Sequence, residues 1–541
     1  MKKRFFVLIC CFSGGLYAQP FTHQDTLRGS ITAERVWWDL VHYHLDIEVK
    51  PEEKFLSGQN TISYRVLEAH DVLQIDLQKP LKIQSVIQDG ETLSVRSDGN
   101  AHFVQLKKEQ AKGSLQQLVV TYEGKPREAV RAPWDGGVSW KKDRDGNHFI
   151  ATSCQGLGAS VWWPCKDHMY DEVDSMHISV EVPENLADVS NGRLLRVVRN
   201  REKKTKTFHW YVANPINNYG VNINIAPYVK WQEKYQGEKG KLDLTYWVLP
   251  ENKKKAKKHF KEVPRMLAAF EHWFGPYPFY EDGYQLVQTP YLGMEHQSSI
   301  TYGNQFFNGY RGRDLSETGW GMKFDFIIVH ESGHEWFANN ITHTDASDIW
   351  IHESFTNYSE SLFLEYHYGK VAGQEYVRGT RMHIENRLPI IGPYHVNYAI
   401  PSSDQYYKGG NILNTLRTLV NDDEKWRQML RNLNQHFYHQ TVKSNELEAY
   451  IGKELNLDLT KFFDQYLRDP RLPVFEYYHA DGQLHYRWTN CIDGFNMPML
   501  AEINGERKQL SPTSDWKKQS LAALDSLEVE VNLYVGVLKA R

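Results

Sequence analysis

The feature that most limits the fold is a change of hydrophobic periodicity along the 541-residue chain. Between residues 36 and 235, short runs such as YHLDIEVK (43–50) and HISVEVP (177–183) alternate apolar and polar residues and are broken by Gly, Asn and Asp. Alternation with a period of two indicates strands that bury one face. We therefore expect an N-terminal antiparallel β-sandwich in a domain that we place at residues 19–235.

Helical periodicity replaces this alternation near Lys253, where apolar residues up to Phe274 recur at helical spacing and the lysine run is the solvated start of a helix. The same helical spacing of apolar residues is found in residues 321–340, 350–368, 409–421 and 424–437. Alternation returns in QLHYRWT and LEVEVNLYVGV. The chain is thus predicted to be a multidomain α+β protein. A mainly helical domain with a small sheet follows at 236–473, and a small C-terminal β domain at 474–541.

Composition and the N-terminus bear on partners and location. With 63 Lys+Arg against 67 Asp+Glu the net charge is −4, so we expect no nucleic-acid partner. Residues 1–18 combine three basic residues, an apolar stretch and small residues that end at Ala18. This pattern predicts a signal peptide, with a retained membrane anchor as the alternative. We expect export to the periplasm or medium, no membrane span in the mature chain, and separate buried thiols rather than a disulfide at Cys154 and Cys165.

The segment FDFIIVHESGHEWFANN contains an H-E-x-x-H motif, whose histidines are His330 and His334. On a helix, residues four apart share a face, so both rings can point at one metal ion with Glu331 beside them. The alternative is an amphipathic helix whose histidines merely lie near the surface. As a non-ligand, Glu331 could act as general base on a water at the metal.

A catalytic zinc ion usually has three protein ligands, so another residue must complete the site. Glu353 follows His334 after 18 residues, enough for a second helix to return antiparallel. Glu360 lies two turns further on, as either a partner of a ligand ring or an exposed acid. Nearby alternatives to the predicted ligands are His343, His352 and Glu335, although His352 should point away from the face of Glu353. Two imidazoles and a carboxylate suit Zn²⁺, while Co²⁺ and Mn²⁺ stay possible on geometry.

Upstream, YLGMEHQSSITYGN (291–304) completes a recognisable pattern. A Met-Glu pair followed by Thr-Tyr, then H-E-x-x-H with a Glu 18 residues later, resembles the M1 (aminopeptidase N-like, gluzincin) family of zinc metallopeptidases. The similarity covers roughly residues 40–470 and includes TSCQGLGASVWWPCKD, FGPYPF, DIWIHESF and YYKGG. It implies a saddle-like N-terminal β domain and a thermolysin-like catalytic domain.

The resemblance also implies roles for individual residues in an aminopeptidase that acts on peptides with a free N-terminus. The ligands of one zinc ion per chain would be His330, His334 and Glu353, with Glu331 as the general base. Glu295 would bind the α-amine, with Gln155 as a second anchor. Tyr406 would stabilise the oxyanion, with Tyr407 as the competing choice. The backbone of Gly293 and Met294 could hold the substrate as an added strand.

The sequence departs from the family pattern at several positions, which are His296, Glu335, His352, Ser354 and the shortened Gly293-Met294-Glu295. None removes a predicted ligand or the base. The family's large C-terminal helical domain is not expected here, which would leave a more open cleft. Three other functions stay open: a leukotriene A4 hydrolase-like epoxide hydrolase, an endopeptidase, and an inactive homologue that serves as a binding scaffold.

Overall fold

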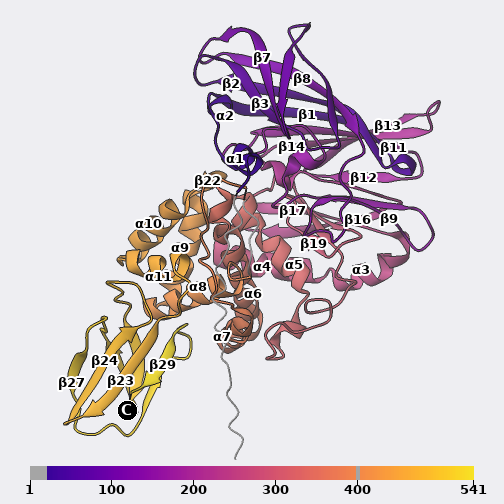
Figure 1. Cartoon of the computed structure of the whole chain (residues 1–541). Helices are drawn as coiled ribbons and strands as arrows, with labels where there is room; N and C mark the ends of the chain where they lie inside the picture. Colours follow the sequence, from indigo (N-terminus) through magenta and orange to yellow (C-terminus); the bar gives the residue numbers. More distant parts are fainter. Residues whose placement is uncertain (1–20, 398–402, 541) are drawn as a thin grey trace, which may run out of the picture.

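The computed structural model describes residues 21–397 and 403–540, which form three regions along the molecule (Figure 1). A β-rich N-terminal region leads into a mainly helical one, and a small β region lies at the far end. The predicted signal peptide lies outside the described residues. Within the described ranges, no helix is both long enough and apolar enough to cross a membrane.

The N-terminal region is built on an eight-stranded sheet of order β13-β14-β11-β1-β2-β8-β4-β5. Its strands are β1 (Trp38–Lys50), β2 (Phe55–Val66), β4 (Lys82–Gln88), β5 (Glu91–Thr92), β8 (Leu115–Gly124), β11 (Ser175–Pro183), β13 (Arg193–Asn200) and β14 (Thr205–Val212). The prediction of a β-rich domain is confirmed. The sheet is not wholly antiparallel, however, because β1 and β11 pair in parallel. About 120 residues of intervening chain allow this crossover.

Two smaller sheets complete this region. One has the order β3 (His70–Asp76), β7 (Ala101–Gln110), β6 (Ser94–Asp98). The other has the order β12 (Ala187–Ser190), β15 (Ile223–Ala226), β10 (His148–Ser153), β9 (Gly137–Lys142). Two short helices, α1 (His23–Gly29) and α2 (Ala33–Val36), precede β1. Cys154 and Cys165 are buried free thiols.

The mainly helical region also contains a five-stranded sheet. Its order is β16 (Val229–Gly237), β17 (Gly240–Val248), β18 (Tyr284–Gln288), β20 (Ser299–Tyr302), β19 (Gly293–Met294). The domain boundary expected after residue 235 falls inside β16, so the new sheet begins before the change of periodicity. Among the described strands, β19 pairs with β20 alone and is therefore the edge strand of this sheet.

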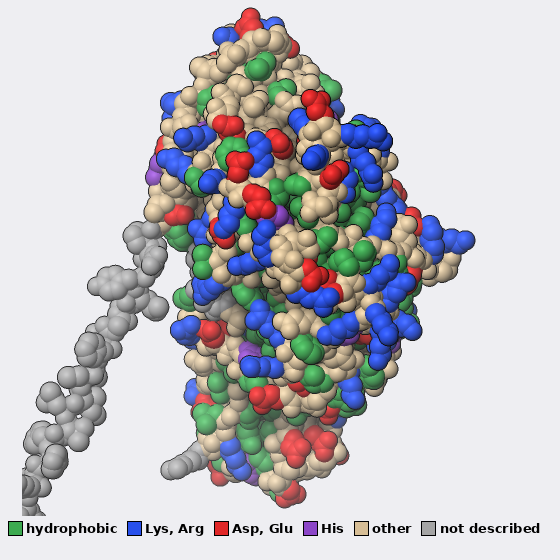
Figure 2. All heavy atoms as spheres, turned by 90° about the vertical axis from the view of Figure 1, so that its right-hand side faces the viewer, with side chains coloured by type: hydrophobic (Ala, Val, Ile, Leu, Met, Phe, Trp, Pro, Cys, Tyr) green, Lys and Arg blue, Asp and Glu red, His purple; other side chains and the backbone are tan. Residues whose placement is uncertain are grey.

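The helices of this region are α3 (Lys253–His259), α4 (Glu262–Phe274), α5 (Phe326–Gly333), α6 (Trp350–Tyr368), α7 (Lys370–Gly379), α8 (Tyr407–Val420), α9 (Asp423–His436), α10 (Ser444–Leu455) and α11 (Thr460–Arg468). The α4 and α5 helices contact the five-stranded sheet. The sequence predicts a single helix from Lys253 to Phe274, but the structure has two helices there, α3 and α4. The break at Phe260 follows from Pro264, whose ring clashes with the carbonyl four residues earlier. Lys254, Lys255, Lys257 and Lys258 are exposed, as expected for a solvated helix start. Figure 2 shows the side of the molecule on which α3 lies in Figure 1, and basic side chains are widely spread over it.

The continuous helix expected over 321–340 is also shorter. α5 begins at Phe326 with Asp325 as its N-cap and ends at Gly333, and a π-type turn, Glu335–Asn339, follows. The turn leaves helical geometry at Phe337 and at Ala338, whose φ is 152°. The Phe337 carbonyl instead accepts a hydrogen bond from His334 Nδ1 at 3.0 Å. The end of α5 therefore frees the Phe337 carbonyl to accept this hydrogen bond, which fixes the orientation of the His334 ring.

The last region contains two small sheets. Their orders are β27 (Lys517–Ser520), β24 (Gln483–Thr489), β23 (Val474–Ala480), β29 (Gly536–Lys539), and β26 (Glu506–Leu510), β25 (Met499–Ile503), β28 (Leu527–Val529). β23 begins at Val474, the residue at which the sequence places the start of this domain. The predicted three-part fold class is thereby confirmed.

Candidate metal centre and active site

The three predicted metal ligands meet between α5 and α6. One ligating atom each of His330, His334 and Glu353 lies within 4.8 Å of the others, and all three residues are buried. Glu353 Oε2 is 3.8 Å from His330 Nε2 and 3.4 Å from His334 Nε2. α6 thus returns beside α5 and places a carboxylate opposite two imidazoles, as the spacing predicts.

Hydrogen bonds to the other ring nitrogens leave both Nε2 atoms available. His330 Nδ1 contacts Glu360 Oε1 at 2.8 Å, and His334 Nδ1 contacts the Phe337 carbonyl at 3.0 Å. Because these acceptors require N–H at Nδ1, both Nε2 atoms present lone pairs. Glu353 Oε2 is buried and has no hydrogen-bond partner among the described residues. Two lone pairs and an unpartnered carboxylate oxygen fit a zinc ion.

A second group of three, Glu295, Glu331 and His334, meets the same distance criterion. It shares His334 with the first group, so the two describe one ion position rather than two. In the first group, hydrogen bonds at Nδ1 leave both Nε2 atoms facing Glu353. The first group is therefore the better candidate for a ligand set, and Glu295 and Glu331 lie beside it.

Glu331 packs against the edge strand β19. A Cβ atom at Gly293 would lie 2.6 Å from Ile327 Cγ2 and 3.0 Å from Glu331 Oε1, so only glycine fits. Burial raises the pKa of Glu331 to about 8 in the protein chain alone, a shift that His330 opposes and Glu295 reinforces. A carboxylate whose proton affinity is raised is suited to accept a proton and release it again.

Glu295 extends the edge strand and receives hydrogen bonds from the N-terminal region. Gln155 Nε2 donates to Glu295 Oε1 at 2.6 Å and to Glu353 Oε1 at 3.1 Å. The Asn339 side chain holds the Glu295 backbone carbonyl at 2.9 Å. The structure thus brings both predicted amine anchors to the metal group.

Tyr219 is a site residue that the sequence did not reveal. Its hydroxyl lies 3.4 Å from His352 Nδ1, and burial together with the neighbouring Glu295 carboxylate raises the pKa of Tyr219 well above its usual range. His352 Nε2 accepts the His343 backbone N–H at 2.9 Å, and burial lowers the pKa of His352 well below its usual range. The neutral ring therefore carries its proton on Nδ1 and donates it to Tyr219, whose own proton can point to Glu295.

The two candidate tyrosines at the start of α8 differ in their neighbours. The Tyr406 ring is 6.0 Å from the His330 ring, and burial together with the neighbouring Glu353 carboxylate raises the pKa of the Tyr406 hydroxyl well above the usual range. The Tyr407 ring instead packs against His383, with ring centroids 4.8 Å apart. Of the two, Tyr406 lies beside the metal group.

The nearby alternatives to the ligands have other contacts. Glu335 accepts hydrogen bonds from Tyr277, the Ser298 backbone and Asn339, and burial raises its pKa to about 7. His343 packs on the ring of His352. His296 lies 3.4 Å from Thr301 Oγ1, and its Nε2 is buried without a partner among the described residues.

Two family models match the chain. The Peptidase M1 N-terminal domain matches residues 40–219, and the Peptidase family M1 domain matches residues 259–466. Together they span most of the sequence and include every predicted site residue. This chain belongs to peptidase family M1.

Relatives of this M1 chain are distant in sequence. The leucyl aminopeptidase of Saccharolobus solfataricus is 20% identical over 77% of this chain and 53% of its own length. Aminopeptidase B of Mus musculus is 22% identical over 81% of this chain and 70% of its own length. The chain spans between 50% and 59% of the length of the relatives from Sulfurisphaera tokodaii and Saccharolobus solfataricus.

Solved structures share the fold. An M1 zinc metallopeptidase from Deinococcus radiodurans superposes with a TM-score of 0.65 at 20% identity, covering 80% of this chain and 94% of that one. A mutant of a Deinococcus radiodurans M1 zinc metallopeptidase bound to a Tyr-Ser-Ala substrate gives a TM-score of 0.66 at 20% identity, with 80% and 95% covered.

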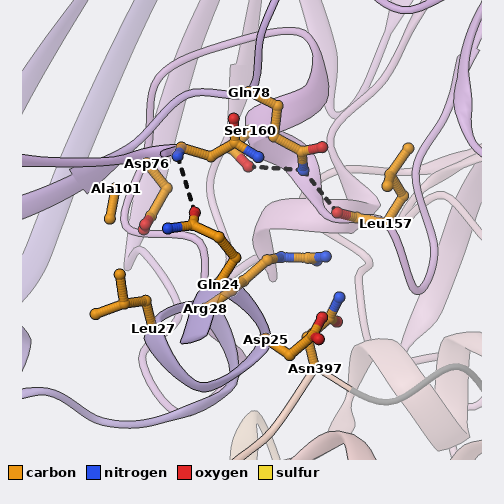
Figure 3. A pocket seen from close by; sticks show the side chains of 11 residues that line it. Gln24, Asp25, Leu27, Arg28, Asp76, Gln78, Ala101, Leu157, Ser160 and Asn397 are labelled. Carbon is orange, nitrogen blue, oxygen red and sulfur yellow. Dashed lines mark hydrogen bonds between the residues drawn. The ribbon is translucent and has the colours of Figure 1, made fainter. Parts of the chain in front are cut away.

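The loop that carries Gln155 in this M1 chain is held from the N-terminal side. Arg28 of α1 donates to the Gly156 carbonyl at 3.1 Å. A cavity of about 160 Å³ lies beside this contact, where Gln78 donates to the Leu157 carbonyl and to Ser160 (Figure 3). None of the predicted site residues lines it. The cavity therefore flanks the loop that positions Gln155 and lies outside the metal group.

Proposed function

We propose that this M1 chain is a zinc-dependent aminopeptidase that hydrolyses the N-terminal bond of peptides. One observation carries the proposal: Glu295, a buried carboxylate that we do not count as a ligand, lies in the same group of close ligating atoms as His334 and Glu331. An acid at this distance from the metal can pair with a substrate ammonium group. It would set how far the attacked carbonyl lies from the peptide's end.

The residues around the metal group then have complementary roles. One catalytic zinc ion per chain would be held by His330, His334 and Glu353, and would supply Lewis-acid activation of water and carbonyl. Glu331 takes the proton of the attacking water and delivers it to the leaving amine. The Tyr406 hydroxyl donates to the oxygen that becomes negative in the transition state.

The edge strand orients the substrate. β19 has one side without a strand neighbour in the described sheet, so a peptide can add to it in extended form. Gly293 and Met294 would contact the peptide backbone, while Glu295 and Gln155 bind the α-ammonium. This arrangement places the first peptide bond next to Glu331, and a peptide without a free amine would lose the ion pair.

Zinc analysis and aminoacyl anilide hydrolysis test this function. The full chain should contain zinc and release aniline from free aminoacyl substrates. Glu331→Gln should bind zinc equally and lose most activity, because an amide cannot accept the proton. A protein that holds no zinc and stays inactive after zinc is added would overturn the proposal and favour a binding scaffold.

We further propose that the substrates are peptides met outside the cytoplasm. Support comes only from residues 1–18, whose composition is that of a cleaved signal peptide ending near Ala18. N-terminal sequencing of the expressed protein tests this proposal. Material from the culture medium or periplasm should begin near residue 19, and a mature chain that begins with Met1 would contradict it.

A further inference from the structure

Four histidines lie together on the outward face of the eight-stranded sheet, away from the active site. They are His42 and His44 on β1, His177 on β11 and His209 on β14, strands that are neighbours in Figure 1. The opposite face of β1 packs Tyr43, Leu45 and Ile47 into the core. The alternation of β1 therefore places these imidazoles on the side that faces away from the core, where His44 is exposed and the others are half-buried.

Two of these rings lie at the spacing of ligands of one metal ion, and the third has to rotate to join them. The three do not have one ligating atom each within 4.8 Å of the others, as the catalytic group does. His42 Nε2 lies 2.9 Å from His177 Nδ1, and the two ring centroids are 5.0 Å apart. The ring of His44, the register partner of His177 across the parallel pair, is 5.5 Å from it. The same centroid distance between His330 and His334 in the catalytic metal group is 5.0 Å. Nitrogens around a tetrahedral zinc ion lie roughly 3.3 Å apart, close to the distance seen here.

We propose that His42, His44 and His177 bind a second divalent transition-metal ion, such as Zn²⁺, at a site separate from catalysis. Two histidines two residues apart on a strand point to one face, and the third, on the adjacent strand, lies opposite one of them. In the present arrangement, His44 Nε2 contacts Ser179 Oγ at 3.4 Å, a long contact on an exposed side chain. Rotation of this ring away from Ser179 would supply the third nitrogen.

The lowered pKa values of His42 and His177 favour metal binding, because a neutral imidazole is available as a ligand and a protonated one is not. Burial, followed by the neighbouring His177 and His44, lowers the pKa of His42 to about 4. Burial and His44 likewise lower the pKa of His177. Rings that are neutral near pH 7 present the lone pairs that a metal requires. An ion there would link β1 to β11. The paired residues His44 and His177 of these two strands are 133 positions apart in the sequence.

Counting bound zinc in variants tests this site, and the count does not depend on activity. Chelator-treated full-length protein is dialysed against micromolar Zn²⁺ and measured by elemental analysis. We expect two ions per chain in the wild type, one in His177→Ala, one in His44→Ala and one in His334→Ala. His485→Ala, which removes a half-buried histidine from the C-terminal region, should retain both.

The outcomes separate this proposal from the catalytic one. His177→Ala and His44→Ala should keep full aminopeptidase activity, and circular dichroism should show unchanged folding, since both rings lie outside the core. A wild type whose only ion is lost in His334→Ala would overturn the second site and leave the catalytic proposal intact. Equal zinc in wild type, His177→Ala and His44→Ala would also overturn it, and the cluster would then be a hydrogen-bonded array of imidazoles.

Discussion

Tyr219→Phe offers a sharp test of how Glu295, the carboxylate that we propose binds the amine, is positioned. The phenol is 5% exposed, burial and the Glu295 carboxylate raise its pKa, and its hydroxyl lies 3.4 Å from His352 Nδ1. Removing the hydroxyl takes away a donor beside this carboxylate and leaves the His352 N–H without its acceptor; a hydrogen bond to a charged group contributes about 1.5–3 kcal/mol. The lower figure corresponds to roughly a tenfold change in an equilibrium constant.

We expect this loss to appear mainly in substrate binding. The variant should hydrolyse free aminoacyl anilides with KM raised about tenfold, kcat lowered less, and zinc content unchanged, since about 1.4 kcal/mol of amine binding is lost. Tyr228→Phe is the matched control, because its buried hydroxyl donates to the Gln288 carbonyl at 2.6 Å. That variant should lower the thermal midpoint similarly and leave KM unchanged. Equal KM in Tyr219→Phe and wild type would show that Tyr219 is only structural.

Three further predictions test other parts of the site. Glu360→Gln should weaken zinc binding by roughly 10- to 100-fold in chelator competition, because a ligand histidine loses its charged partner; an unchanged affinity would refute this role. Tyr406→Phe should lower kcat by about 100-fold, about 3 kcal/mol, while Tyr407→Phe stays near wild type; the reverse ranking would exchange their roles. Gly293→Ala should lower kcat by displacing Glu331, with zinc retained; wild-type kinetics would show that this strand tolerates a side chain.

The structure brings together the three residues that the sequence proposed as metal ligands, because the determinants of their positions are local. Two histidines four residues apart on one helix, and a return helix that starts at Trp350, bring the three ligands together once the helices pack. The length of α5 was overestimated for a physical reason. Its end depends on the Phe337 carbonyl turning to His334, a contact that no helix propensity encodes.

Contacts between segments far apart in the sequence were harder to predict from the sequence. Gln155 entered the site only through resemblance, since it is 140 residues from Glu295 in sequence. Tyr219 carried no signal, because the segment around it looks like an ordinary turn while its partners lie more than 70 residues further along the chain. The outward histidines of β1 could be read from strand alternation, but their approach to His177 depends on the parallel pairing with β11.

The most direct test of the central claim is the product formed from one peptide in two forms. Zinc-loaded protein is incubated with a peptide whose N-terminus is free or acetylated, and the products are identified by mass spectrometry. The account predicts stepwise loss of single residues from the free peptide and at least a hundredfold slower cleavage of the acetylated one, about 2.7 kcal/mol of lost ion pairing. Internal cleavage of both forms at similar rates would contradict the assignment of Glu295 and the aminopeptidase function.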